Sequence, residues 1–112
     1  MDVILQSYLH TALWSSIDED EPMDCDYDVD DFSEEAIGQA ECDLVSFFGL
    51  ARDLIVDDVK TTVAHDFWLT RNGHGAGFWD GDYEHGDELT EICKQFKELS
   101  PYAGDDGKIY FI

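Results

Sequence analysis

The densest run of chemically active side chains lies between residues 18 and 35, in the stretch DEDEPMDCDYDVDDFSEE. This run holds eleven carboxylates, and the first 51 residues together hold fourteen acids without a lysine or an arginine. Over the whole chain of 112 residues, 27 acids against 6 bases give a formal charge of −21. Such a field repels nucleic acids and anionic membranes, and it attracts proteins whose working surface is basic.

Within the acidic run, charged residues alternate with less polar ones. Four aspartates alternate with three other residues, in the order Asp24, Cys25, Asp26, Tyr27, Asp28, Val29 and Asp30. An extended segment would place the four carboxylates on one side, roughly 6.6 Å apart, because a strand rises about 3.3 Å per residue. Phosphates along a DNA strand have a spacing of the same order. The pattern predicts a docking face for a cation-lined groove, with carboxylates in the place of phosphates.

The expected contact region therefore covers the acidic run and the first acids of the helix after it. Its residues are Asp18, Glu19, Asp20, Glu21, Asp24, Asp26, Tyr27, Asp28, Asp30, Asp31, Glu34 and Glu35. Tyr27 and Phe32 are candidates for apolar anchors in this contact, unless they only fasten the segment to the body of the protein. A solvated, mobile acidic loop is the alternative interpretation of the whole run. A homodimer would double the length of any phosphate-like row.

The same aspartates also form a partial calcium motif. Asp24, Asp26, Asp28 and Glu35 match positions 1, 3, 5 and 12 of an EF-hand loop, but Val29 occupies the position where a sharp turn needs glycine. A second partial match comprises Asp80, Asp82, Glu84 and Glu91, with His85 at the glycine position. A protein that binds divalent cations is therefore the second hypothesis for function.

Three histidines are candidate ligands for the metal of a hydrolase. His65, His74 and His85 have Asp66, Asp80, Asp82 and Glu84 nearby in the sequence. Imidazole and carboxylate groups bind several metals, but the spacings match no named site such as HExxH. The expectation is therefore a protein that is not an enzyme and has no cofactor.

The cysteines and the hydropathy bear on the cellular compartment. Cys25, Cys42 and Cys93 form no CxxC motif, and Cys42 and Cys93 occupy apolar positions of helical patterns, which predicts buried thiols. The sequence shows neither a signal peptide nor an apolar run of about 18 residues. A reducing cytoplasm is the expected location.

Apolar spacing predicts three helices. They cover residues 2–15, a long segment from an N-cap at Asp31 to about residue 56, and a segment from a cap at Asp87 through Leu99. Residues 65–71 (HDFWLTR) are expected to form a strand, Asn72-Gly73 a two-residue hairpin turn, and residues 108–112 a terminal strand after a turn at 104–107. Trp68 is expected in the core. These elements predict a single α+β domain, with about three helices packed on a small antiparallel sheet of three or four strands.

The run AHDFWLTRNGHGAGFWDGDYEHGDELTEICKQF (Ala64 to Phe96), continued by YAGDDGKIY (Tyr102 to Tyr110), resembles a widespread group of small, uncharacterised tailed-phage proteins. The resemblance covers the C-terminal half and implies a phage-encoded accessory protein acting inside a bacterial cell. It implies no catalytic residues. Size and charge are also similar to those of phage DNA-mimic inhibitors, which block restriction enzymes, CRISPR effectors, DNA-repair enzymes or nucleoid proteins. A DNA-mimic inhibitor is thus the first hypothesis, and a phage structural or assembly component is the third.

Overall fold

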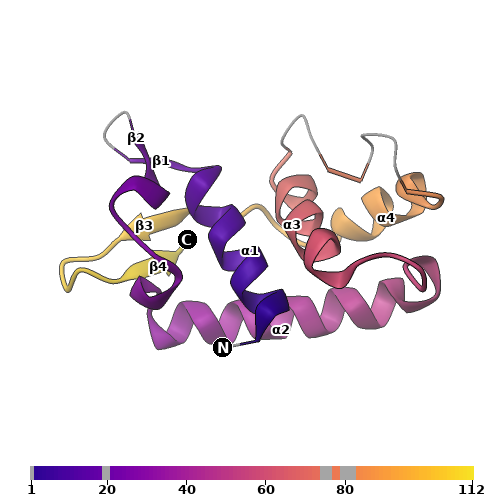
Figure 1. Cartoon of the computed structure of the whole chain (residues 1–112), viewed down its shortest axis with the longest axis horizontal. Coiled ribbons are helices and arrows are strands. Elements are labelled where there is room, and N and C mark those ends of the chain that lie inside the picture. The colour runs from indigo at the N-terminus through magenta and orange to yellow at the C-terminus, as the bar shows by residue number, and fades with distance from the viewer. Residues whose placement is uncertain (1, 19–20, 74–76, 79–82) are drawn as a thin grey trace.

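The computed structural model describes residues 2–18, 21–73, 77–78 and 83–112 (Figure 1). Within these ranges it confirms the α+β class, with four α-helices and two short antiparallel hairpins. The elements in chain order are α1 (Val3–Trp14), β1 (Ile17–Asp18), β2 (Glu21–Pro22), η1 (Met23–Cys25), η2 (Val29–Asp31), α2 (Glu34–Ala51), η3 (Arg52–Leu54), α3 (Lys60–Arg71), α4 (Gly86–Cys93), β3 (Pro101–Ala103) and β4 (Ile109–Phe111).

The longest helix, α2, runs along the long axis of the molecule, and the other helices lie over it (Figure 1). Helices α1 and α3 pack side by side, while α4 covers the C-terminal part of α2. The β3–β4 hairpin lies at the opposite end, beside the N-terminus of α2. The acidic segment, residues 16–31 between α1 and α2, therefore lies at the same end as this hairpin in its described part.

Aromatic side chains from several elements form the centre of the core. Phe47 of α2 stacks on Phe67 of α3 with ring centroids 4.2 Å apart, and it also stacks on Phe78 at 5.6 Å. Tyr8 of α1 contacts Phe67 and meets the Trp68 ring edge-on. All five side chains are buried, so the expectation that Trp68 belongs to the core is confirmed.

The predicted hairpin at residues 65–73 is wrong, because residues 65–71 belong to helix α3. Asn72 is the C-cap of this helix, and its backbone N–H donates to the carbonyl of Trp68 at 3.3 Å. Gly73 follows with φ of +71°. A type I′ hairpin turn and a helix C-terminus both use a glycine with positive φ, so Asn-Gly fits either structure.

The strands consequently form two separate pairs instead of one sheet of three or four strands. The terminal strand and the turn before it are confirmed, since β4 pairs with β3 around residues 104–107. Helix α4 ends at Cys93, earlier than the predicted end near Leu99, although Phe96 and Leu99 still pack against the core.

Helix α2 begins two residues later than an N-cap at Asp31 would require. Ser33 is the N-cap, and its hydroxyl accepts a hydrogen bond from the Ala36 N–H at 3.0 Å. Asp31 instead bonds back to the N–H of Asp28.

Cys93 is buried as predicted, but Cys42 is exposed, because it projects from α2 between the buried positions Ala40 and Leu44.

None of the helices in the described ranges is both long enough and apolar enough to cross a lipid bilayer.

Candidate functional site

The acidic segment is a series of tight turns, so the prediction of one extended strand is wrong. A short β1–β2 hairpin is followed by the 3₁₀ turns η1 and η2. Asp26 has helical backbone angles, whereas Asp28 is extended with φ of −124° and ψ of 171°. Because the backbone changes direction between these residues, the four aspartates do not form a straight row with the spacing of a strand.

Side-chain hydrogen bonds account for this local structure. The Asp28 carboxylate accepts from the N–H of Val29 at 2.7 Å, and the Asp31 carboxylate accepts from the N–H of Asp28 at 2.8 Å. The Asp28 carboxylate also accepts from the N–H of Asp31, so Asp28 and Asp31 form a reciprocal capping box at η2. Aspartate competes in this way with regular strand pairing, since its short side chain satisfies nearby backbone donors. The alternating aspartates therefore stabilise turns and not a strand.

Apolar side chains fasten the acidic segment to the core at both ends. Met23 is 2% exposed at the start of η1, and Phe32 is 3% exposed just after η2. Between them, Tyr27 and Val29 are half-buried and pack against the core. Phe32 therefore holds the segment to the body of the protein, which was the alternative to a role as a contact anchor. Tyr27 keeps part of its surface exposed.

The acids of this segment share one end of the molecule with a second acidic turn (Figure 1). Ser33 donates its backbone N–H to the carbonyl of Ile109 at 2.9 Å, which brings the β3–β4 hairpin against the segment. We call the exposed carboxylates of this region the acidic end. Within the described residues they are Glu21, Asp24, Asp26, Asp28, Asp30, Glu34, Glu35, Asp105 and Asp106.

Sequence reasoning missed Asp105 and Asp106, which it placed only in a turn. Asp106 accepts hydrogen bonds from the Tyr110 hydroxyl at 2.6 Å and from the Lys108 N–H at 3.0 Å, and these bonds lower the pKa of its carboxyl group. The same contact with Asp106 raises the pKa of Tyr110. Lys108 is exposed beside these acids.

The remaining predicted contact residues are either not fully exposed or not fully described by the structure. Asp31 is half-buried at the capping box. The backbone of Asp18 pairs with Glu21 in the β1–β2 hairpin. Glu19 and Asp20 lie outside the described residues.

The carboxylates around Cys25 affect the pKa of its thiol. Its pKa is raised above the ordinary value by desolvation and by neighbouring carboxylates, first among them Asp24. The acids next to Cys25 thus act together on a single titratable group.

The described parts of the chain contain no group of three or more His, Cys, Asp or Glu side chains that could hold a metal ion, so they give no support to the calcium or the hydrolase hypothesis. His65 contacts Asp66 at 2.9 Å, whereas His85 contacts Glu88 at 3.3 Å. His74 and the Asp80 and Asp82 pair of the second calcium motif lie outside the described residues.

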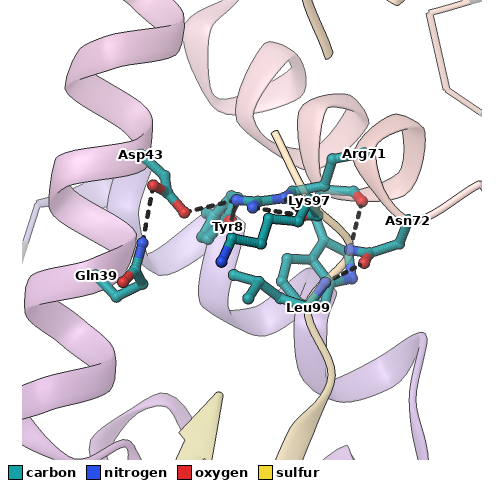
Figure 2. Close-up of polar contacts among 8 residues, drawn as sticks. Tyr8, Gln39, Asp43, Arg71, Asn72, Lys97 and Leu99 are labelled. Atoms are coloured by element: carbon teal, nitrogen blue, oxygen red, sulfur yellow. Dashed lines mark hydrogen bonds and ion pairs between the residues drawn. The ribbon is translucent and has the colours of Figure 1, made fainter. Parts of the chain in front are cut away.

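A buried polar network around Arg71 was also missed by sequence reasoning (Figure 2). The Arg71 guanidinium donates to the Tyr8 hydroxyl at 2.9 Å, and two of its nitrogens donate to the Lys97 carbonyl at 2.7 and 3.0 Å. It lies over the rings of Phe67 and Phe96, each 5.4 Å from its central carbon. Burial raises the pKa of Tyr8 well above its usual range. This network joins helices, and among the residues that the structure describes no buried side-chain nitrogen or oxygen lacks a hydrogen-bond partner.

No known protein family, no curated protein and no solved structure matches this chain.

Proposed function

We propose that the protein is a phage-encoded acidic inhibitor that occupies the DNA-binding surface of a host protein. The observation that carries this proposal is the acidic end, where exposed carboxylates from the acidic segment, the start of α2 and the β3–β4 turn are gathered. DNA-binding surfaces meet phosphates with lysine and arginine, and counterions are released when the charges pair. Carboxylates offered on a folded surface attract the same residues.

Because the acidic segment consists of turns, its carboxylates would imitate a curved group of phosphates and not a straight row of them. Buried Met23 and Phe32 hold the segment against the core, so its carboxylates keep a defined arrangement. A preorganised surface loses less conformational entropy on binding than a mobile tail. The proposed contact is therefore a curved cluster of charges that enters a basic cleft.

The partner class follows from the charge and from the resemblance of the C-terminal half to tailed-phage proteins. A phage gains from blocking a restriction enzyme, a CRISPR complex, a repair enzyme or a nucleoid protein. Each of these binds nucleic acid through a basic surface. We propose no direct contact between this protein and nucleic acid, because its formal charge is −21.

The test is capture of host proteins on the immobilised chain, followed by elution with duplex DNA. The mimicry proposal expects a captured protein that DNA displaces and whose affinity falls as salt rises. The acidic-end variant replaces Asp24, Asp26 and Asp30 by Asn and leaves the capping carboxylate of Asp28 in place. It should weaken capture at least about tenfold, since hydrogen-bonded charge pairs at interfaces are worth 1.4 kcal/mol or more.

The matched control, called the far-end variant, carries Asp53→Asn, Asp57→Asn and Glu91→Gln. Asp53 lies in η3 and Asp57 in the turn after it, both beyond the C-terminus of α2, and Glu91 lies in α4, which packs against α2. All three acids are exposed, and the net charge of the variant equals that of the acidic-end variant. The control should retain capture. Equal weakening by both variants, or a captured protein that DNA leaves in place, would contradict the proposal.

A further inference from the structure

A groove between α1 and α2 exposes apolar surface on a face that the acidic segment does not use. Its volume is about 580 Å³. Helix α1 contributes Ile4 and Leu5 to its lining, and α2 contributes Ile37, Leu44, Val45 and Phe48. Val45 is 75% exposed, although it lies in the middle of the longest helix. An apolar side chain at such a position has no partner within the described fold.

Carboxylates form the rest of the lining. Asp2 is the N-cap residue of α1 and Glu41 lies on α2, so each side of the groove contributes an acid. The described lining residues include no lysine or arginine. The groove therefore combines an apolar floor with negative edges.

We propose that this groove binds an amphipathic helix of a partner protein, with apolar residues in the groove and lysine or arginine along its flanks. Helix-in-groove recognition places residues at i, i+3, i+4 and i+7 into such a surface. Basic flanking residues complement Asp2 and Glu41. The proposal concerns a different face from the acidic end and stands whether or not the acidic end imitates DNA.

Charge also decides between a partner helix and a second copy of this chain. Two copies meeting at this face would bring their own Asp2 and Glu41 residues together, each copy with a formal charge of −21. Like charges at an interface oppose association. A basic segment instead gains both the apolar contact and the electrostatic attraction.

The probe is a synthetic, fluorescently labelled peptide of about 18 residues, with leucines at helical spacing and lysines elsewhere. A scrambled peptide of the same composition has equal charge but no apolar face. Binding of both peptides to the folded protein is measured by fluorescence anisotropy in about 0.15 M salt, where screening acts over about 8 Å. The amphipathic peptide should bind at least about tenfold more tightly than the scrambled one.

Two variants of α2 locate the binding. Val45→Gln removes an exposed apolar side chain from the groove, whereas Leu50→Gln makes the same kind of change at a 52% exposed position outside its lining. Val45→Gln should weaken binding of the amphipathic peptide about tenfold, and Leu50→Gln should change it less than about twofold. Helical circular dichroism of both variants confirms that α2 persists.

Three results would overturn the proposal. The scrambled peptide would bind as tightly as the amphipathic one, the two variants would bind with equal affinity, or sedimentation would show a dimer that Val45→Gln dissociates. The acidic-end variant should bind the amphipathic peptide within about threefold of the unchanged protein while losing its DNA-displaceable partner. Failure of one proposal is therefore distinguishable from failure of the other.

Discussion

Arg71 of α3 and Asp43 of α2 form a buried ion pair, with 2.7 Å between Nη1 and Oδ2 (Figure 2). The Arg71 side chain is 3% exposed and that of Asp43 is 14% exposed. Because the same guanidinium also bonds to Tyr8 and to the Lys97 carbonyl, one cation joins α1, α2, α3 and the segment after α4. The chain has 6 basic residues, and one of them, Arg71, is buried in the core.

Replacing Asp43 by Ala should destabilise the fold by about 3 kcal/mol, because the guanidinium stays buried after losing its countercharge. The free energy of unfolding is measured by urea denaturation. Asp53→Ala is the control, since Asp53 lies 3.6 Å from Arg52 in an ion pair with both side chains more than 80% exposed. It should leave stability unchanged. Equal effects of the two substitutions would show that the buried pair contributes no more than a surface pair.

Gly77→Ala and Gly38→Ala should change stability in opposite directions. Gly77 has φ of +137°, and a Cβ there would collide with the hydroxyl of Thr70, which accepts the Phe78 N–H at 3.0 Å. We expect a loss of about 2 kcal/mol. Gly38 lies inside α2 with open space around it, so alanine should stabilise by about 0.8 kcal/mol. Thermal and urea unfolding measure both, and a neutral Gly77→Ala would contradict the placement of Phe78 against α3.

The Cys25 thiol should report the field of the acidic segment. In a Cys42→Ser background, Cys25 is the exposed cysteine, because Cys93 is buried. Since the pKa of Cys25 is raised, the thiolate fraction at a given alkaline pH is reduced and its reaction with a disulfide reagent is slowed. Added salt, or Asp24→Asn with Asp26→Asn, should shift the midpoint of the pH–rate profile downward. A midpoint that neither treatment moves would exclude an effect of these carboxylates.

Salt should stabilise the protein, since it screens repulsion among the exposed carboxylates. The melting temperature of the unchanged chain should rise with sodium chloride. The acidic-end variant should melt at a higher temperature in low salt and gain less from added salt. Differential scanning calorimetry of this variant and the far-end variant compares the two regions. An equal salt response in both would mean that repulsion is spread over the whole surface.

Much of the helical framework could be predicted from the sequence. Apolar residues at helical spacing from Ile37 to Ile55 predict the helix that contains α2, although α2 ends at Ala51 and Arg52–Leu54 form the 3₁₀ turn η3. The terminal strand follows from residues 108–112 and the turn before them. The charge and its bias toward the first half of the chain are also properties of the sequence alone. These features depend on residues near one another in the chain, so local patterns are enough to find them.

Tertiary structure decided the features for which local signals were ambiguous. The run HDFWLTRNG fits a strand with a hairpin turn and also a helix with a C-cap. In the helix that the structure shows, Phe67 contacts Phe47 and Arg71 pairs with Asp43. The alternating aspartates fit a strand until their side chains bond to the backbone. Gathering Asp105 and Asp106 with the acidic segment required the contact between Ser33 and Ile109. Such contacts join residues far apart in the chain, so no local pattern contains them.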